Sequence, residues 1–318
     1  MPDANAPSDT PLFSIIIPVY NRADLIERTL ESIEAQTCRD FEVIAVDDGS
    51  KDNSLEVLRK HEPRIRVVTH EGGVNKGLGA TRNRGMEFAR GRYMAWLDSD
   101  DLWLPWTLES FKEAIAEHND PPFVMGNFVE FAEESEFAGL ERTPTQTRAY
   151  ADYLARPTGE GVMAPSCAMG RADVVREAGG FAELRVNCED LDMYFRLCTV
   201  SPWVRIESPV TLALRRGHAS MVGNLKHTLA GITHVIDENK ADRYPGGAER
   251  AKQRLRVLGA HTRPATVTMR RAGDTASAWT LYKRTFGVNT AAGRWKYLAA
   301  FPVQLAWTKL FGKKGAPS

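Results

Sequence analysis

The sequence predicts an α/β fold in which a mostly parallel sheet carries helices on both faces, followed by a helical C-terminal extension. Short apolar runs alternate with segments of helical period, and from Leu225 onward the pattern is helical throughout. Apolar runs of this kind are typical of strands that are buried on both faces. Their alternation with helices is typical of parallel strands joined by right-handed crossovers.

Composition is ordinary for a soluble globular protein, with 43% hydrophobic and 26% charged residues in a chain of 318. The net charge of zero hides an asymmetry. Residues 241–318 carry 15 Lys and Arg against 3 Asp and Glu, a net charge of +12, so the first 240 residues carry −12. A basic segment beside an acidic body predicts contact with an anionic partner, which is either a membrane surface or the body itself.

The ends of the chain and its cysteines predict a cytoplasmic protein. Residues 1–11 are polar and acidic, without the regions of a signal peptide, and are expected to be disordered. No run reaches about 18 uninterrupted apolar residues, so no spanning helix is expected. The cysteines lack C-x-x-C spacing, which favours reduced thiols over disulfides or a zinc site; they are Cys38, Cys167, Cys188 and Cys198.

Four buried strands are predicted before residue 101, with helices between them. The strands are Leu12–Val19, Phe41–Val46, Ile65–Val68 and Arg92–Leu97. After the first strand, Asn21 is a candidate cap for a helix that places Leu30 and Ile33 on one face. A glycine-rich loop leads into the helix before the fourth strand.

Polar residues follow the carboxyl end of each predicted strand, where ligands bind in doubly wound sheets. These stretches are Tyr20–Arg22, Asp47–Ser50, Glu71–Gly79 and Asp98–Asp101. The last one holds three carboxylates in four residues, which repel one another unless a cation lies among them. Oxygen ligands on a short loop suit Mg²⁺ or Mn²⁺. A solvated turn explains a D-x-D pattern taken alone, but the convergence of four polar loops favours a binding site.

Glycines at 72, 73, 77 and 79 are expected to let the backbone approach a ligand closely. Their spacing matches neither the P-loop nor the dinucleotide-binding fingerprint. Nearby, Arg82 and Arg84 are either phosphate ligands or ordinary surface charge.

Beyond residue 101, an amphipathic helix is expected with Pro105 in its first turn, and a strand over Pro121–Phe131. Residues 133–157 show no period apart from weak helix at Tyr150–Leu154.

The acids of NCEDLDMYFRL lie at the start of a helix, where its dipole alone accounts for them. In the C-terminal extension, helix breaks are expected near Tyr244–Gly247, at Gly259–Pro264, and at glycines 287 and 293.

Four motifs in order carry a specific resemblance: SIIIPVYNR, VDDGSKDNS, NKGLGATRNRGMEFARGRYMAWLDSDD and GGFAELRVNCEDLDMYFRL. Together they resemble family 2 glycosyltransferases of the GT-A fold, from Ser14 to Leu197 and weakly on to His218. The resemblance implies an inverting hexosyltransferase-like enzyme that uses a nucleotide-diphosphate sugar and a divalent metal, Mn²⁺ or Mg²⁺. A UDP-sugar is the commonest donor among such proteins, and the acceptor hydroxyl belongs to a glycan or a lipid-linked molecule of cell-surface polysaccharide synthesis.

The same resemblance assigns the nucleotide-binding residues. Pro18, Tyr20 and Asn21 would border the base and ribose. Asp48 would hydrogen-bond the base, with Asp47 as its competitor for that role.

The resemblance also assigns the diphosphate and metal site. Arg82 would lie near base or phosphate, and Asp98 would face the ribose or a metal-bound water. Asp100 would bind the metal that bridges the two phosphates, and His218 would complete the metal or diphosphate site. Asp101 is expected to act only locally.

For the acceptor side, the resemblance assigns Asp190 as the general base that takes the proton of the attacking hydroxyl. Glu189 would orient donor or acceptor, and Arg215 and Arg216 would meet the diphosphate.

We therefore predict a glycosyltransferase domain over 12–224, with a nucleotide-binding half (12–101) and an acceptor half (102–224), and a basic helical region over 225–318. Aromatic and basic residues alternate over 294–314, so this segment either lies peripherally at the inner face of a membrane or docks on the acidic body. A nucleic-acid partner is not expected. The alternative functions are a sugar nucleotidyltransferase and a non-catalytic nucleotide-sugar-binding protein.

Overall fold

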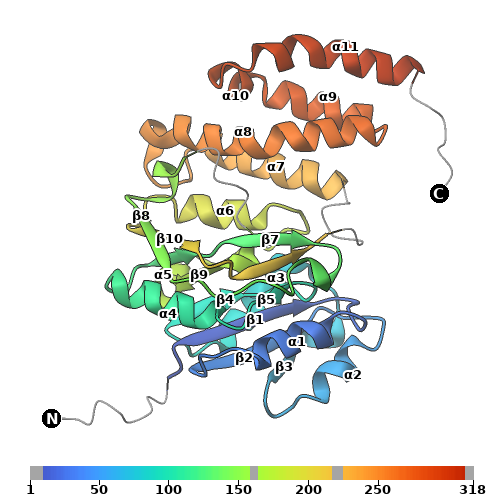
Figure 1. Cartoon of the computed structure of the whole chain (residues 1–318). Helices are drawn as coiled ribbons and strands as arrows, with labels where there is room; N and C mark the ends of the chain where they lie inside the picture. Colours follow the sequence, from blue (N-terminus) through green and yellow to red (C-terminus); the bar gives the residue numbers. More distant parts are fainter. Residues whose placement is uncertain (1–9, 158–163, 217–224, 312–318) are drawn as a thin grey trace. The chain divides into compact units, whose positions relative to one another are not determined.

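A computed structural model describes residues 10–157, 164–216 and 225–311 of the protein. By their contacts the residues fall into two compact units. The sheet unit comprises Met1–Ala155, Met163–Arg185 and Val200–His218, and the helical unit comprises Arg156–Val162, Val186–Thr199 and Ala219–Ser318. Figure 1 follows the chain through both units in the order of its sequence.

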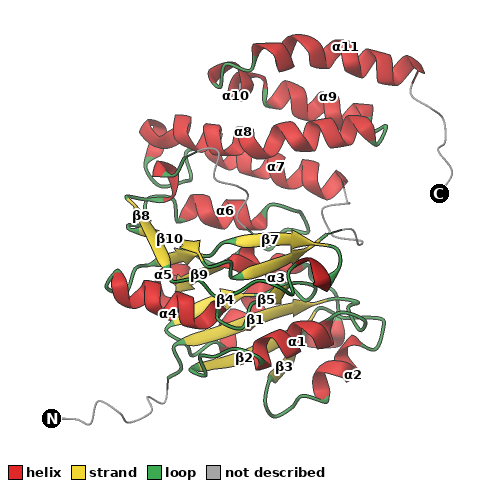
Figure 2. Ribbon diagram, viewed as in Figure 1, coloured by secondary structure: helices red, strands yellow, loops and turns green. Residues whose placement is uncertain are grey.

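The main sheet of the sheet unit has eight strands among the described residues, in the order β3-β2-β1-β4-β9-β6-β10-β8 (Figure 2). Their bounds are Phe13–Val19 (β1), Phe41–Asp47 (β2), Arg66–Thr69 (β3), Tyr93–Trp96 (β4), Phe123–Met125 (β6), Gln146–Tyr150 (β8), Ala168–Arg171 (β9) and Trp203–Ser208 (β10). The first four strands pair in parallel, as do β6 and β10, whereas β9 is antiparallel to both neighbours and β8 to β10. The predicted α/β class with a mostly parallel sheet is confirmed.

A smaller sheet in the same unit orders its strands β5-β11-β7, which span Leu102–Trp103, Leu212–Arg215 and Phe128–Phe131. The single strand predicted over Pro121–Phe131 is therefore divided between two sheets. The division falls at Gly126, where an added Cβ would lie 2.1 Å from the Thr211 hydroxyl oxygen. Glycine thus permits the close approach at which the chain passes from one sheet to the other.

Helices cover both faces of the main sheet in this unit. They are α1 (Ile26–Glu34), α2 (Ser54–Arg59), α3 (Leu78–Phe88), α4 (Thr107–Glu117) and α5 (Ala172–Glu177). Ile15 and Ile17 of β1 join one apolar cluster with Leu30 of α1. Ile16 points the other way, toward α3, where an added Cβ on Gly85 would lie 2.4 Å from it. The alternation along β1 therefore places helices on opposite sides of the sheet.

Two local predictions in the sheet unit are wrong. Pro105 precedes α4, which begins at Thr107 with Trp106 at the cap position. In place of the weak helix over Tyr150–Leu154, β8 ends at Tyr150 and a 3-10 turn follows at Tyr153–Ala155. Pairing with Trp203 keeps Tyr150 extended, so tertiary contact overrides the local pattern at the start of the predicted helix.

The helical unit stacks its helices in successive layers (Figure 1). They are α6 (Glu189–Arg196), α7 (Leu225–Lys240), α8 (Gly247–Arg271), α9 (Thr275–Arg284), α10 (Phe286–Ala291) and α11 (Trp295–Phe311). The break predicted at Gly259–Pro264 is wrong, since this stretch lies inside α8. The break predicted at Gly287 occurs two residues earlier, at Thr285 between α9 and α10. Fully buried Leu258, Thr262 and Thr266 show that α8 is packed through this stretch, and packing offsets the penalty of about 3 kcal/mol for an interior proline.

Within the described ranges no helix is both long and apolar enough to span a bilayer. The cysteines at 38, 167, 188 and 198 are free thiols, as predicted.

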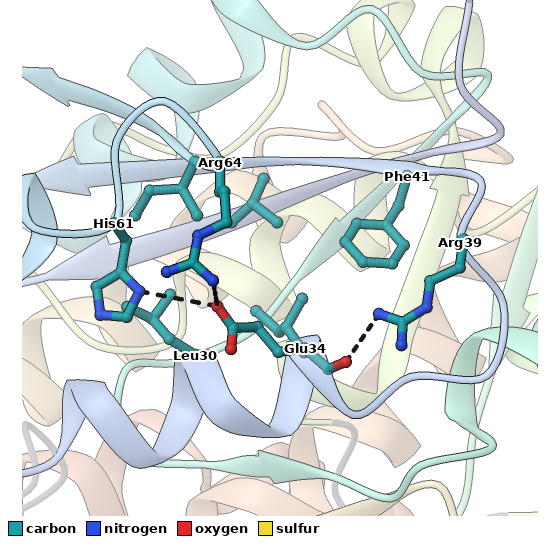
Figure 3. A pocket seen from close by; sticks show the side chains of 9 residues that line it. Leu30, Glu34, Arg39, Phe41, His61 and Arg64 are labelled. Atoms are coloured by element: carbon teal, nitrogen blue, oxygen red, sulfur yellow. Dashed lines mark hydrogen bonds and ion pairs between the residues drawn. The ribbon is translucent and has the colours of Figure 1, made fainter.

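A cavity of about 370 Å³ lies between α1 and the starts of β2 and β3 in the sheet unit (Figure 3). Apolar side chains such as Leu30 and Phe41 line it, together with Glu34, Arg39 and Arg64. The Glu34 carboxylate pairs with Arg64 at 3.1 Å, and its backbone carbonyl accepts from Arg39 at 2.8 Å. The cavity is near the amino ends of these strands, at the end opposite to the predicted ligand edge.

Candidate active site

The loops after β1 and β2 are tied together by Asn21. Its side-chain oxygen accepts from the Lys51 amide at 2.7 Å, and its own amide donates to the Ser50 hydroxyl at 3.0 Å. Asn21 adopts a left-handed conformation (φ 51°), and α1 begins only at Ile26 without a side-chain cap. The prediction that Asn21 caps this helix is therefore wrong, because its side-chain oxygen and its backbone amide both bind the loop after β2.

The neighbouring residues of the same strand end differ in accessibility. Tyr20 is 43% exposed at the end of β1. Pro18 is buried within β1, opposite Val46 of β2. Of these two, Tyr20 presents its side chain to solvent in the described structure.

The Asp48 carboxylate holds the loop that precedes α3. One oxygen accepts from the Lys76 amide at 2.6 Å and the other from the Gly77 amide at 3.0 Å. The His70 ring lies 3.4 Å from the same carboxylate, and burial lowers the pKa of His70. Asp48 is itself buried, so its two oxygens are committed to shaping this loop.

Asp47 retains an acceptor. Its Oδ2 accepts from the amides of Gly49 and Ser50 at 3.1 and 3.2 Å. Its Oδ1 is buried and has no hydrogen-bond partner among the described residues. A buried carboxylate oxygen without a donor is unfavourable, so this atom is suited to a donor that a ligand supplies.

Not every glycine of the loop before α3 serves ligand approach. An added Cβ on Gly79 would lie 2.2 Å from the Ala182 carbonyl oxygen, so this glycine lets two segments of the protein pack. The expectation that Gly79 admits a ligand is therefore wrong. Gly72, Gly73 and Gly77 have positive φ and shape the loop itself.

The turn after β4 carries the predicted acids, and Asp98 pairs with a buried arginine. The Arg82 guanidinium donates to Asp98 Oδ1 at 2.6 Å and lies 5.1 Å from the centre of the Phe181 ring. Arg82 is 1% exposed, whereas the Asp98 side chain is 30% exposed. The buried guanidinium thus fixes a carboxylate that is still open to solvent.

Asp100 lies against a second arginine, from the loop after β1. Its Oδ2 is 3.4 Å from Arg22 Nε, and its backbone carbonyl accepts from Arg215 Nε at 3.0 Å. The turn is therefore flanked by cationic groups from two other elements. Such groups favour an anionic ligand at this edge of the sheet.

Asp101 is buried and joins three segments. Its carboxylate accepts from the Ser166 hydroxyl at 2.6 Å and from the Arg215 amide at 3.0 Å. Burial, and then the charges of Asp98 and Asp100, raise the pKa of Asp101 well above its usual value. The residue thus anchors the turn to β11 and to the segment before β9.

Glu189 and Asp190 belong to the helical unit, whereas the three acids of the turn belong to the sheet unit. Glu189 is buried and Asp190 is half-buried at the start of α6, where Asp190 Oδ1 accepts from the Leu191 amide at 2.7 Å. The residue before them, Cys188, has φ 70°, a conformation that is uncommon outside glycine. Strain of this kind is concentrated at functional sites.

A family model with the description glycosyl transferase family 2 matches residues 14–179, more than half of the chain. This chain belongs to that family. The match includes the strand-end loops and the acidic turn and ends before the Glu189–Asp190 pair.

Curated relatives of this family-2 chain include the putative teichuronic acid biosynthesis glycosyltransferase TuaG of Bacillus subtilis, 42% identical over 34% of this chain and 44% of that protein. Another is the UDP-Glc:alpha-D-GlcNAc-diphosphoundecaprenol beta-1,3-glucosyltransferase WfgD of Escherichia coli, 36% identical over 38% of this chain and 47% of that protein. The matched region spans less than half the length of either relative.

Two solved structures share the fold. S. aureus TarS in complex with UDP-GlcNAc has a TM-score of 0.58 and 17% identity, covering 89% of this chain and 91% of that one. The Pyrobaculum calidifontis mannosyltransferase PcManGT in complex with GDP-Man and Mn²⁺ has a TM-score of 0.52 and 18% identity, covering 97% and 89%. At these identities the likeness concerns the fold, and it supports the GT-A class expected from the sequence.

The acidic turn of this family-2 chain fits a hard divalent cation in part. In the part of the chain that the structure describes, no three His, Cys, Asp or Glu side chains converge as a complete metal site. Asp98 and Asp100 nevertheless supply two partly exposed carboxylates on one turn. Mg²⁺ and Mn²⁺ are commonly held by one or two carboxylates together with waters and substrate phosphates. The predicted ligand His218 lies outside the described residues.

Sequence reasoning assigned no role to two residues of this site. Arg22, in the YNR stretch, pairs with Asp100, and Ser166 donates to Asp101. Arg22 lies in the polar stretch Tyr20–Arg22 expected at the ligand edge, but its pairing with Asp100 was not predicted. Nothing in the local sequence marks Ser166, which contacts a residue 65 positions away.

Proposed function

We propose that this protein transfers a sugar, with inversion, from a nucleotide-diphosphate sugar to a hydroxyl of a glycan or lipid-linked acceptor. The observation that carries the proposal is the acidic turn Asp98–Asp101 at the carboxyl end of β4, flanked by Arg22 and Arg215. Acidic and cationic groups side by side suit a diphosphate accompanied by a metal ion. The names of TuaG and WfgD, which refer to teichuronic acid biosynthesis and to UDP-Glc with a diphosphoundecaprenol-linked sugar, support this direction.

For the donor half of the mechanism, Arg82 orients Asp98 toward the ribose or a water, and Asp100 is the proposed metal ligand. Bound Mn²⁺ or Mg²⁺ supplies positive charge where the departing diphosphate gains negative charge. Arg22 and Arg215, adjacent to Asp100, add cationic character at the same edge. Tyr20 borders the base and ribose from its exposed position.

For the acceptor half, Asp190 takes the proton of the attacking hydroxyl, and Glu189 orients a substrate. An inverting transfer needs such a base, because the acceptor oxygen attacks directly at the anomeric carbon. The bond from the Leu191 amide holds one Asp190 oxygen in place. The Glu189–Asp190 pair also favours glycosyl transfer over nucleotidyl transfer, which has no need of a base there.

A thermal-shift panel of nucleotide sugars, with Mn²⁺ and with EDTA, tests this function. We expect UDP-sugars to raise the melting temperature in Mn²⁺ and to lose most of that effect in EDTA. Incubation of the stabilising donor with a glycan or lipid-linked acceptor is expected to release nucleoside diphosphate. Release of pyrophosphate would instead identify a nucleotidyltransferase, and binding without turnover would identify a nucleotide-sugar-binding protein.

Amide substitutions at Asp47 and Asp48 test which of the two carboxylates contacts the base of the nucleotide. Asp47→Asn keeps one acceptor for the loop amides but turns the unpartnered oxygen into a donor, so we expect nucleotide affinity to fall about tenfold or more with little change in melting temperature. Asp48→Asn leaves one amide of the Lys76–Gly77 pair without an acceptor, so the melting temperature of the free protein is expected to fall. Titration calorimetry with UDP measures the affinities. If Asp47→Asn binds UDP with wild-type affinity and Asp48→Asn does not, Asp48 is the residue that contacts the base.

We further propose that α11 places the protein peripherally on a membrane. Leu298, Phe301 and Leu305 on one side of this helix are buried in the helical unit. Val303, Trp307 and Leu310 on the other side are 67–74% exposed, Lys296 shares that side, and exposed Lys309 lies in the last turn. A helix that is apolar on both sides is expected to be covered on both, and basic residues beside the outer apolar side suit an anionic lipid surface.

Flotation on vesicles tests the proposed membrane contact. The wild-type chain is expected to float with anionic vesicles and less with neutral ones, and the double substitution Trp307→Ser with Leu310→Ser is expected to remain at the bottom of the gradient. Both residues are exposed, so the melting temperature should not change. Val74→Ser, at an exposed apolar residue of the sheet unit, is the matched control. Equal flotation of the double variant and the control would contradict the proposed contact of α11 with the membrane.

A further inference from the structure

The segment Val186–Thr199, here called the base segment, carries Glu189 and Asp190 and groups with the helical unit. Its helix α6 has eight residues and lies next to α7 (Figure 1). Isolated helices of this length are not stable in water, so the orientation of α6 must come from its contacts. The base segment contacts α7 and the turn between α7 and α8.

At the start of the base segment, Asn187 is held against α7. Its amide donates to the His227 carbonyl at 3.3 Å, and its side-chain amide donates to the Thr228 hydroxyl at 2.7 Å. An added Cβ on Gly231 would lie 1.6 Å from the Asn187 carbonyl oxygen. The backbone of α7 therefore touches the base segment three residues before Asp190, and glycine is required for that contact.

Two residues after Asp190, the buried Asp192 is held by the turn between α7 and α8. Its Oδ1 accepts from the Tyr244 hydroxyl at 2.7 Å and lies 3.5 Å from His234 Nε2 of α7, and its Oδ2 accepts from Arg196 at 2.7 Å. The Tyr244 ring also packs edge-on against Phe195 at 5.3 Å. Burial, and then the charge of Asp192, raise the pKa of Tyr244, so its hydroxyl remains a donor at all physiological pH values.

The turn that carries Tyr244 is itself fixed by a fully buried arginine. Arg254 of α8 donates to Asn239 Oδ1 at 2.7 Å and to the carbonyls of Pro245 and Gly247 at 2.7 and 2.8 Å. A buried guanidinium is tolerated only when its donors are satisfied in good geometry, so this turn has little conformational freedom. A rigid support of this kind is what a positioned catalytic group requires.

We propose that the Tyr244–Asp192 hydrogen bond is a positioning device for the general base, so that the C-terminal helices set the rate of transfer. This inference rests on the proposed role of Asp190. Catalytic groups must be held within about 0.5 Å of their productive geometry, and looser support lowers turnover without weakening donor binding. Tyr244 and Asp192 are thus positioning residues that act through α6.

Tyr244→Phe tests the inference, because it removes only the hydroxyl that reaches Asp192. Tyr282→Phe is the matched control: Tyr282 is also buried in the helical unit, and its hydroxyl donates to the Leu298 carbonyl at 2.8 Å, away from the base segment. We expect Tyr244→Phe to lower kcat about 10-fold to 100-fold and to shift the acidic limb of its pH profile, with the donor KM unchanged. The control is expected to leave kcat and the pH profile unchanged.

Hydrogen exchange measures the anchoring of the base segment without relying on sugar transfer, so it tests this inference separately from the proposed function. We expect amides of residues 187–196 to exchange faster in Tyr244→Phe than in the wild-type chain or in Tyr282→Phe. Unchanged exchange there, or kinetics identical to those of the control, would overturn the inference. Absence of transfer by the wild-type chain would overturn the proposed function, and faster exchange in Tyr244→Phe would still support the anchoring of the base segment.

Discussion

Asp190→Asn is expected to lower kcat for sugar transfer about 10²-fold to 10⁴-fold, the usual contribution of a general base. The amide has the shape of the carboxylate and keeps an oxygen for the Leu191 amide, so α6 should retain its structure. It cannot accept a proton from the acceptor hydroxyl. Nucleotide affinity is expected to be unchanged, because the donor-binding residues belong to the loops after β1, β2 and β4.

Two measurements check this expectation. Single-turnover transfer to acceptor reports the chemical step, and titration calorimetry with nucleoside diphosphate reports donor binding. Asp237→Asn is the matched control, since Asp237 is an exposed acid of the helical unit that pairs with Arg284 at 2.8 Å. Transfer by Asp190→Asn at the wild-type rate would show that another group is the base.

Asp100→Ala is expected to abolish the metal dependence of nucleotide binding and to weaken binding in Mn²⁺ by about tenfold or more. Removing this carboxylate deletes a proposed metal ligand and leaves Arg22 without the partner at 3.4 Å. Arg22 keeps its bond to the Asn21 carbonyl at 3.1 Å and would still present positive charge at this edge of the sheet. Part of the affinity in EDTA is therefore expected to survive, while the gain on adding Mn²⁺ disappears.

Calorimetric titration of nucleoside diphosphate in Mn²⁺ and in EDTA measures both effects. Asp173→Ala serves as the control, since this acid is 66% exposed on α5 and pairs only with nearby Arg171 among the contacts described for it. If Mn²⁺ raises the nucleotide affinity of Asp100→Ala as much as that of the control, a residue other than Asp100 binds the metal.

The strands and the ligand edge of the sheet could be predicted from sequence because their signals are local. A run such as Ser14–Val19 is apolar at nearly every position because it is buried on both faces. Polar residues must follow such runs, and the topology of a parallel sheet brings their ends to one edge. The positions of Tyr20, Asp48 and Asp98 at strand ends follow from these two facts.

The partners of those residues could not be predicted, because each contact joins segments far apart in the chain. Whether Asp47 or Asp48 keeps an unpartnered oxygen depends on the loop at Lys76–Gly77. Likewise the helix through Pro264 depends on packing by neighbouring helices, which the local glycine and proline pattern does not report.

The sequence by itself determined the fold class, the positions of the first four strands and the acidic character of the turn at Asp98–Asp101, since burial and charge are written into short stretches. Only the tertiary structure decided what holds each acid: Arg82 for Asp98, Arg22 for Asp100, and Tyr244 for Asp192. The last pair is separated by 52 positions. Orientation of a side chain depends on atoms that folding brings to it, and no local pattern of residue types contains that information.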